Sequence, residues 1–199
     1  GAAASAASAA SAASAAAATD GAATSTAAAG DEDNGDDAEP MTQVLWPRHC
    51  VQHTEGAALH PGLCAGPGSR PSCAGDLLVY KGTNPRVDSF SAFFDNSRLE
   101  EPRTAQGTTL QDELRMRGVT HVYVCGLALD VCVYHTAIDA KEAGFCTSVV
   151  TDACRGVNRI DIEQRMREMG EAGIALVRAS EVPHMMAGRT LSDALADAI

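Results

Sequence analysis

The sequence has few aromatic residues and no apolar run long enough to cross a membrane. Trp, Tyr and Phe make up 4% of its 199 residues, and no segment approaches the ~20 apolar residues that a membrane-spanning helix needs. Basic residues are also scarce, because 15 Lys and Arg stand against 26 Asp and Glu, for a formal net charge of -11. An acidic chain repels phosphates, so we expect neither nucleic acid nor an anionic membrane as a partner.

Residues 1–40 lack large apolar side chains altogether. They are nearly all Ala, Ser, Gly, Thr, Asp and Glu, with Ser-Ala-Ala repeated between Ser5 and Ser14. Nothing there can be buried to offset the entropy of ordering, so we expect a disordered, acidic and Ala-rich tether. The basic start and Leu-rich core of a signal peptide are missing from it. Residues 41–199 are the expected folded part, about one domain's worth.

No Cys-x-x-Cys pair occurs, which argues against a structural zinc knuckle. The cysteines are Cys50, Cys64, Cys73, Cys125, Cys132, Cys146 and Cys154. Their number is odd and several lie inside expected strands, so a disulfide framework is not indicated either. We therefore expect a protein of a reducing, cytoplasmic compartment.

Short apolar runs alternate with helical patterns along the folded part. The patterns predict strands at residues 76–81, 121–127, 146–151 and 174–178, and helices at residues 108–117, 131–143, 159–171 and 190–198. Thr108 is the expected N-cap of the first helix, and Gly118 its end. Such alternation with short connections favours parallel pairing. The predicted fold class is α/β, with a three-layer parallel sheet.

Cys132 lies just after the predicted strand 121–127, where the chain enters a helix. This junction places its sulfur at the carboxyl edge of a parallel sheet, where open α/β sheets bind ligands. The positive end of the helix favours the thiolate form there. A buried structural cysteine is the alternative for any single Cys, but the surrounding pattern favours a nucleophile.

Four separated motifs occur in a fixed order. They are WPRHCVQHTEGAALHPGL (46–63), YKGTNPRVDSFSAFFDN (80–96), GLALDVCVYHTAIDAKEAGF (126–145) and VVTDACRGV (149–157). Together they resemble the nicotinamidases of the isochorismatase-like cysteine hydrolases, over roughly residues 44–180. The resemblance implies a Rossmann-like fold and the hydrolysis of nicotinamide to nicotinate and ammonia, a step of NAD salvage.

The resemblance also implies roles for individual residues. Cys132 corresponds to the nucleophile that forms a thioester, and Lys81 to the catalytic lysine beside it. A cis peptide bond is implied at Leu127-Ala128. It turns the backbone N–H groups of Ala128 and Cys132 toward the substrate oxygen as an oxyanion hole.

Ring binding and a metal follow from the same resemblance. Trp46 corresponds to the aromatic that packs on the pyridine ring, and Phe93 is a second aromatic expected to face it. His49 corresponds to one ligand of a divalent metal ion (Zn, Fe or Mn) that holds the pyridine nitrogen. The remaining histidines considered match no catalytic role, so a structural role is expected for His53, His60 and His135.

Two motifs of the family are missing from this sequence. One is Asp-x-Gln-x-Asp-Phe, whose first Asp is the general base, and the other is Asp-x-His, which supplies two metal ligands. Asp130 matches a structural Asp instead. We therefore expect a C-terminal portion of a family domain, truncated at the N-terminus, with the missing strands lying between the strand of Lys81 and that of Cys132. Residues 1–40 are not expected to replace them.

Two alternatives remain open. The chain could be another cysteine hydrolase that acts on a different small amide, or a degenerate member that only binds or oligomerises. The combination of Trp46 with His49 argues against the first alternative, and the retention of Cys132 and Lys81 argues against the second. The expected partner is the small molecule nicotinamide, and a homo-oligomer is compatible with each alternative.

Overall fold

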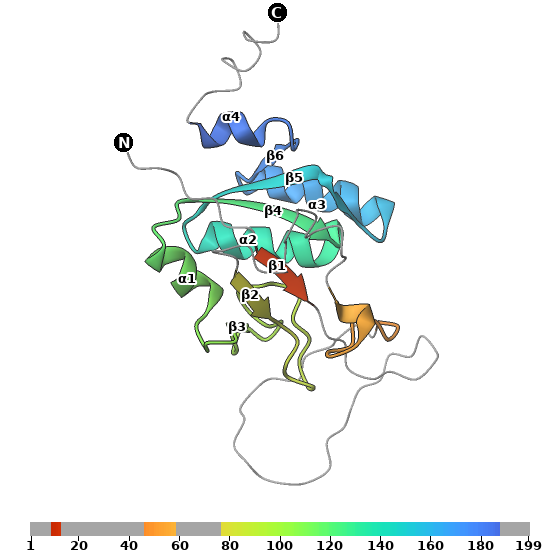
Figure 1. Ribbon diagram of the computed structural model, residues 1–199. Helices are drawn as coiled ribbons and strands as arrows, with labels where there is room; N and C mark the ends of the chain where they lie inside the picture. The colour runs from red at the N-terminus through yellow and green to blue at the C-terminus, as the bar shows by residue number, and fades with distance from the viewer. Residues whose placement is uncertain (1–8, 13–45, 59–76, 188–199) are drawn as a thin grey trace, which may run out of the picture.

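The computed structural model of the chain describes residues 9–12, 46–58 and 77–187 (Figure 1). Its strands are β1 (Ala9–Ala12), β2 (Leu77–Tyr80), β3 (Arg103–Thr104), β4 (His121–Leu127), β5 (Cys146–Arg155) and β6 (Ala175–Val177). Its helices are α1 (Leu110–Met116), α2 (Tyr134–Glu142), α3 (Arg159–Glu171) and α4 (Val182–Met186), with a 3₁₀ turn η1 (Glu55–Ala57) and a π-type turn η3 (Leu129–Val133). Within these ranges no helix is both long and apolar enough to cross a membrane.

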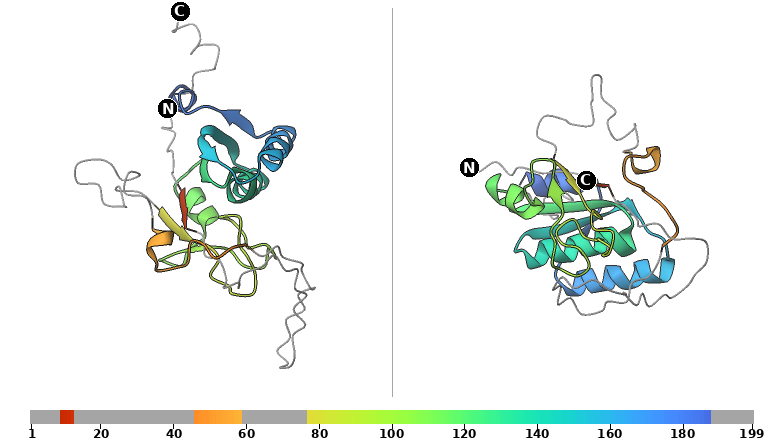
Figure 2. Two further views of the ribbon diagram at one scale, coloured as in Figure 1. Left: turned by 90° about the vertical axis from the view of Figure 1, so that its right-hand side faces the viewer. Right: turned by 90° about the horizontal axis from the view of Figure 1, so that it is seen from below.

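Strands β4, β5 and β6 form a parallel sheet in that order. Its register places Val149 of β5 opposite Val124 of β4 and Leu176 of β6. Helix α2 packs on β4 and β5, and α3 packs on α2 and β6. Figure 2 shows both helices on the same side of this sheet. The predicted α/β class with a parallel sheet is confirmed, while the three-layer arrangement stays a prediction.

The strand β2 that leads to Lys81 lies in a second sheet, of order β1-β2-β3. β1 pairs with it in parallel, from Ala9 opposite Leu77 to Ala12 opposite Tyr80. The expectation that residues 1–40 supply no strand is therefore wrong for these four residues. Small alanines bring little to a core, but their backbone N–H and C=O groups can still pair with the edge of β2. The remainder of this Ala-rich segment lies outside the described residues.

Helix α1 begins one residue later than its sequence pattern predicts. Thr109, not Thr108, is its N-cap, and its Oγ1 accepts a hydrogen bond from the N–H of Asp112 at 3.1 Å. Thr108 instead donates its hydroxyl to Oε1 of Glu113 at 2.7 Å. Adjacent threonines can both cap in principle, so the sequence alone could not choose between them.

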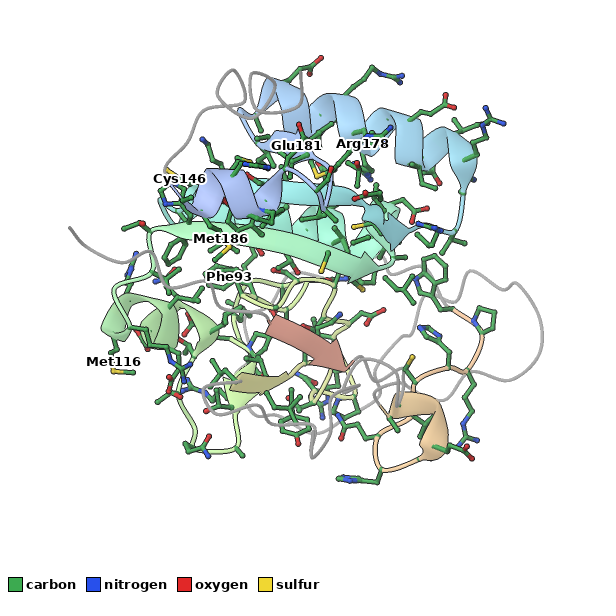
Figure 3. All side chains as sticks on the ribbon, turned by 45° about the horizontal axis from the view of Figure 1, so that its top comes forward. Phe93, Met116, Cys146, Arg178, Glu181 and Met186 are labelled. Carbon is green, nitrogen blue, oxygen red and sulfur yellow. The ribbon has the colours of Figure 1, made fainter. Side chains whose placement is uncertain are left out.

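The helix predicted at 131–143 is in fact two elements, η3 followed by α2. Helix α3 has its predicted bounds, and β5 is longer than predicted. The short helix α4 was not predicted. Its N-cap, Glu181, accepts the N–H of Arg178 at 2.6 Å through Oε2 (Figure 3). The helix predicted at 190–198 lies outside the described residues.

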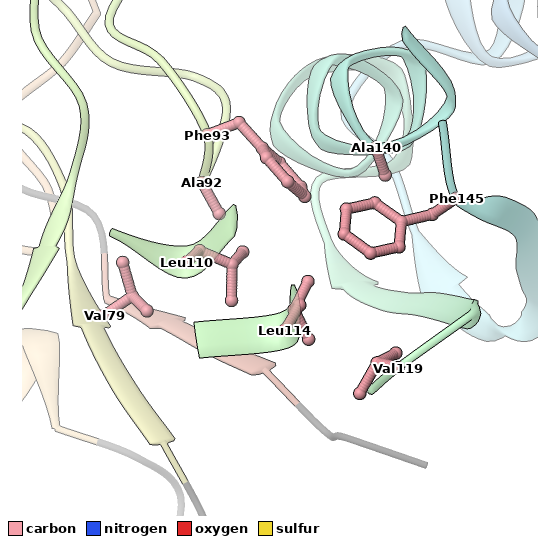
Figure 4. Packing of buried hydrophobic residues seen from close by; sticks show 8 residues of the cluster. All are labelled: Val79, Ala92, Phe93, Leu110, Leu114, Val119, Ala140 and Phe145. Atoms are coloured by element: carbon pink, nitrogen blue, oxygen red, sulfur yellow. The ribbon is translucent and has the colours of Figure 1, made fainter. Parts of the chain in front are cut away.

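Two hydrophobic clusters hold these elements together. One joins η3, α2 and α3 to β5, with Met169 and Val149 fully buried in it. The other joins β2 and α1 to the loop before β3 and to α2 (Figure 4). Its buried members are Val79, Ala92, Phe93, Leu110, Leu114, Val119, Ala140 and Phe145. This second cluster fixes the strand of Lys81 against the helix that follows Cys132.

Candidate active site

Lys81 follows directly after β2, and its ammonium is buried in the protein. The residue is only 2% exposed. Nζ donates hydrogen bonds to the carbonyl oxygens of Ser89 at 2.7 Å and Phe90 at 2.9 Å, and a third to Sγ of Cys132 at 3.2 Å. A lysine ammonium has three N–H donors, so these contacts use all of them. The structure thus brings together the two residues that the sequence singled out for the chemistry.

Cys132 lies on η3, between β4 and α2. Ala128 is the N-cap of this turn, and its carbonyl accepts the N–H groups of Val131 at 3.1 Å and Val133 at 3.0 Å. Neither bond uses the N–H of Cys132. The peptide bond between Leu127 and Ala128 is cis, as the resemblance implied. The first N–H groups of a helical segment carry partial positive charge. The sulfur of Cys132 therefore lies near the positively polarised start of the segment formed by η3 and α2.

Asp130 is close to Cys132 in the chain, but its carboxylate is engaged elsewhere. Oδ1 and Oδ2 accept the N–H of Val157 at 3.0 and 3.1 Å, and Oδ2 accepts the N–H of Asn158 at 2.8 Å. A Cβ at Gly156 would lie 2.7 Å from Oδ1 of Asp130, so this close approach requires glycine. The geometry agrees with the structural role expected for Asp130.

The two carbonyls that hold Lys81 belong to a loop built on bonds from side chains to backbone. Oδ1 of Asp88 accepts the N–H of Ser89 at 2.9 Å, and Oδ1 of Asn96 accepts the N–H of Phe90 at 3.1 Å. Short polar side chains that satisfy nearby backbone groups favour loops over regular structure. The sequence did not single out Ser89 and Phe90, because they hold Lys81 through backbone carbonyls, which every residue has. The only signal was the polar Asp and Asn spacing around them.

His135 packs beside this loop, three residues after Cys132. Its ring centroid lies 5.4 Å from that of Phe90, and it meets Tyr134 edge-on at 5.0 Å. Burial lowers the pKa of His135 below its ordinary value of 6.5, and the positive charge of Arg165 lowers it further. The imidazole is therefore neutral near pH 7. This placement agrees with the structural role expected for it.

Comparison with known proteins identifies the family. Residues 1–181 match the Isochorismatase domain. The chain belongs to the isochorismatase family. The nicotinamidase of Escherichia coli (strain K12) is 44% identical over 138 residues, which cover 68% of this chain and 59% of the E. coli protein. The chain thus spans less than two thirds of the length of that isochorismatase-family relative.

Two solved structures share the fold. PnC1 from L. infantum, in complex with nicotinate, is 32% identical with a TM-score of 0.56, and the match covers 69% of this chain and 62% of that one. The pyrazinamidase of Pyrococcus horikoshii, in complex with zinc, is 32% identical with a TM-score of 0.53, covering 68% of this chain and 64% of that one. Both similarities confirm the isochorismatase-like fold that the four motifs indicated.

Trp46 and His49, for which the family resemblance implied substrate and metal contacts, lie on the described segment before η1. Trp46 is half-buried and His49 is exposed. The segment is tied to the active site by Gln52, whose Nε2 donates to the carbonyl of Gly82 at 3.2 Å, directly after Lys81. In residues 46–58 and 77–187, no hydrogen bond joins Trp46 or His49 to the Lys81 ammonium.

A complete metal site is not formed by the residues that the structure describes. Nδ1 of His49 lies 2.7 Å from the carbonyl of Pro47, so Nδ1 carries the proton and Nε2 is left as the coordinating nitrogen. Zinc takes four ligands in structural sites and three protein ligands in catalytic ones. Over the described ranges, no group of three or more His, Cys, Asp or Glu side chains is gathered to hold an ion. The role of His49 as a metal ligand therefore stays a prediction.

Phe93, which the sequence analysis expected to face a substrate ring, is buried in the core. Phe93 is 3% exposed, and its ring lies in the hydrophobic cluster with Ala140 and Phe145 (Figure 4). Its centroid is 6.3 Å from that of Phe145. Loops have no fixed period, so the sequence could not show which of the neighbouring aromatics turns inward. Phe90, of the same loop, is the aromatic whose backbone contacts Lys81.

The cysteines of the described residues carry free thiols. They are Cys50, Cys125, Cys132, Cys146 and Cys154. Burial raises the pKa of the thiols of Cys125 and Cys154, which favours their protonated form. Free thiols agree with the absence of a disulfide framework among these five. Cys64 and Cys73 lie outside the described residues, and the reducing compartment stays a prediction.

Proposed function

We propose that this isochorismatase-family protein hydrolyses the carboxamide of nicotinamide or pyrazinamide through a cysteine thioester. The 3.2 Å contact between Nζ of Lys81 and Sγ of Cys132 carries the proposal. The other two partners of this buried ammonium are neutral carbonyls. A buried charge is costly unless it is paired, and of the three partners only the sulfur of Cys132 can take a negative charge that balances it. The similarity to proteins named nicotinamidase and pyrazinamidase supports the choice of substrate.

In the first step, the sulfur of Cys132 attacks the carboxamide carbon. A C–S bond forms, the C–N bond breaks, and the nitrogen leaves as ammonia with the proton that came from the thiol. In the tetrahedral intermediate, after the C–S bond has formed and before the C–N bond breaks, the former carbonyl oxygen is negatively charged. The N–H groups of Ala128 and Cys132, at the start of η3, are the proposed donors to it, and such donors contribute a few kcal/mol each.

In the second step, water attacks the thioester carbon and the C–S bond breaks. One proton of the water goes to the sulfur and restores the Cys132 thiol, and the other is released with nicotinate. Both steps need a general base to carry the proton. The family's Asp base is expected from the sequence to lie outside this chain, and Asp130 is engaged by the N–H groups of Val157 and Asn158. We assign the base to no described residue.

Trp46 is the proposed aromatic that packs on the pyridine ring. His49 is a proposed ligand of a divalent ion (Zn, Fe or Mn) that would hold the ring nitrogen as a Lewis acid. A zinc complex of a solved relative supports an ion of this kind. Neither chemical step described above passes through the metal, because both are carried out at the carboxamide carbon.

Trapping the thioester tests this function. The protein that contains this chain is mixed with nicotinamide and quenched in acid, and its peptides are examined by mass spectrometry while ammonia is measured in parallel. We expect a nicotinoyl group on the Cys132 peptide and none on the Cys146 peptide, together with ammonia release. Ammonia release that persists after Cys132 has been fully alkylated would overturn the proposal.

A further inference from the structure

The loop that holds Lys81 is attached to the helix that follows Cys132 through a hydroxyl group. Oγ1 of Thr136, on α2, accepts a hydrogen bond from the N–H of Ala92 at 3.1 Å. Thr136 follows Cys132 by four residues, about one helical turn along the same face. Ala92 is 3% exposed and follows Phe90, whose carbonyl accepts the Lys81 ammonium, by two residues. This bond is therefore linked to Cys132 along the helix, and to Lys81 through the loop backbone and the hydrogen bond at the Phe90 carbonyl.

The same loop contacts the same helix at two further places. Before Ala92, the ring of Phe90 packs on His135. After it, NH1 of Arg98 donates to Oδ1 of the buried Asp139 at 2.8 Å. The loop thus runs along α2, with the bond to Ala92 between the two outer contacts. Its backbone cannot move relative to the helix without breaking some of these contacts.

We propose that Thr136 is a positioning residue for the Lys81–Cys132 pair. Its hydroxyl fixes the backbone at residues 89–92, and so fixes the carbonyls of Ser89 and Phe90 that aim the ammonium at the sulfur. A lysine side chain has a flexible four-carbon stem, so the position of its head depends on such partners. Without the hydroxyl, the N–H of Ala92 would be buried and unpaired, and the loop would shift to satisfy it. This role deepens the proposed cysteine hydrolysis and rests on it.

Three variants separate positioning from general stability. Thr136→Val keeps the shape of the side chain but removes the acceptor, whereas Thr136→Ser keeps the hydroxyl. Thr147→Val is the matched control, because Thr147 is 5% exposed and its hydroxyl donates to the carbonyl of Phe145 at 3.1 Å. Thr147 lies near the start of β5, and Cys132 follows the far end of the neighbouring parallel strand β4.

The main readout is the rate at which iodoacetamide alkylates Cys132 at pH 7, followed by peptide mass spectrometry in the protein that contains this chain. This readout needs no substrate. In Thr136→Val we expect alkylation to slow by about 10-fold or more, because small displacements of paired reactive groups have large effects. We expect kcat for nicotinamide to fall by a similar factor with KM little changed.

Thr136→Ser and Thr147→Val should both stay close to the wild type in alkylation. Wild-type alkylation in a folded Thr136→Val protein would overturn the positioning role, and so would an equal slowing in Thr147→Val. If nicotinamide is not hydrolysed by the wild type while Thr136→Val still slows alkylation, positioning stands and the proposed substrate fails. If nicotinamide is hydrolysed equally well by the wild type and Thr136→Val, the function stands and positioning fails.

Discussion

Oδ2 of Asp130 lies 2.8 Å from the backbone nitrogen of Asn158, and this bond joins the turn that carries Cys132 to the start of α3. Asn158 in turn caps α3, because its Oδ1 accepts the N–H of Ile160 at 2.9 Å. The Asp130 carboxylate therefore holds the turn of Cys132 against the start of α3. Its contribution can be measured as stability.

Asp130→Ala should lower the free energy of unfolding by about 3 kcal/mol, because it leaves the N–H groups of Val157 and Asn158 without their charged acceptor. Asp130→Asn keeps one acceptor oxygen and should lose less. Urea unfolding of both variants measures the difference. Equal stability of the alanine variant and the wild type would show that water replaces the carboxylate and that the bond does not anchor the turn.

Phe93→Ala should act on stability and not on substrate binding, since its ring is part of the core beside Phe145. Removing a buried phenylalanine ring costs about 3–5 kcal/mol. We expect a loss of this size in urea unfolding, with KM for nicotinamide unchanged for the folded fraction. A raised KM with unchanged stability would instead return Phe93 to the substrate site.

His135 should make the stability of the protein depend on pH. Burial lowers its pKa in the folded state, with Arg165 and Lys81 lowering it further and Asp139 and Glu168 opposing them. Well above pH 6.5 His135 is neutral in both states. As the pH falls below 6.5, the unfolded chain takes up the proton first, so the free energy of unfolding decreases until the folded pKa is passed. His135→Gln should flatten this decrease. Unfolding curves between pH 5 and 8 measure it, and an unchanged slope would contradict the burial of His135.

Most regular elements could be predicted from local pattern. The apolar run at residues 121–127 and the helix at 159–171 are continuous signals with clear ends, and both have the predicted bounds. The pairing of Lys81 with Cys132 was implied by the resemblance of their motifs to those of the family. These features depend on short stretches of sequence, which is why sequence reasoning reached them.

Other features depend on contacts between distant segments. The sequence does not show that the loop lies along α2. It therefore could not predict the roles of the Ser89 and Phe90 carbonyls or of the Thr136 hydroxyl. Phe93 was expected at the substrate, but an aromatic residue in a loop can face the core or the surface, and the sequence does not show which. The strand β1 was missed because its sequence, Ala-Ala-Ser-Ala, has no alternation of large apolar and polar residues.

His49 should contribute to metal binding in the protein that contains this chain. If it is a ligand, His49→Ala should lower the content of divalent metal and raise KM for nicotinamide, because the ion would hold the ring. His53→Asn is the control, since His53 is exposed and its φ of 61° is one that Asn tolerates. Elemental analysis measures the metal. Unchanged metal content in His49→Ala would remove His49 from the ligand set.

The central claim is that Cys132 is the nucleophile. It is tested most directly by the rate of ammonia release from nicotinamide, measured for the wild type and for Cys132→Ala in the protein that contains this chain. Cys50→Ala and Cys146→Ala serve as controls, since neither sulfur contacts the Lys81 ammonium. We predict release at background for Cys132→Ala and near the wild-type rate for both controls. Release near the wild-type rate by Cys132→Ala, or an equal loss in all three variants, would contradict the account.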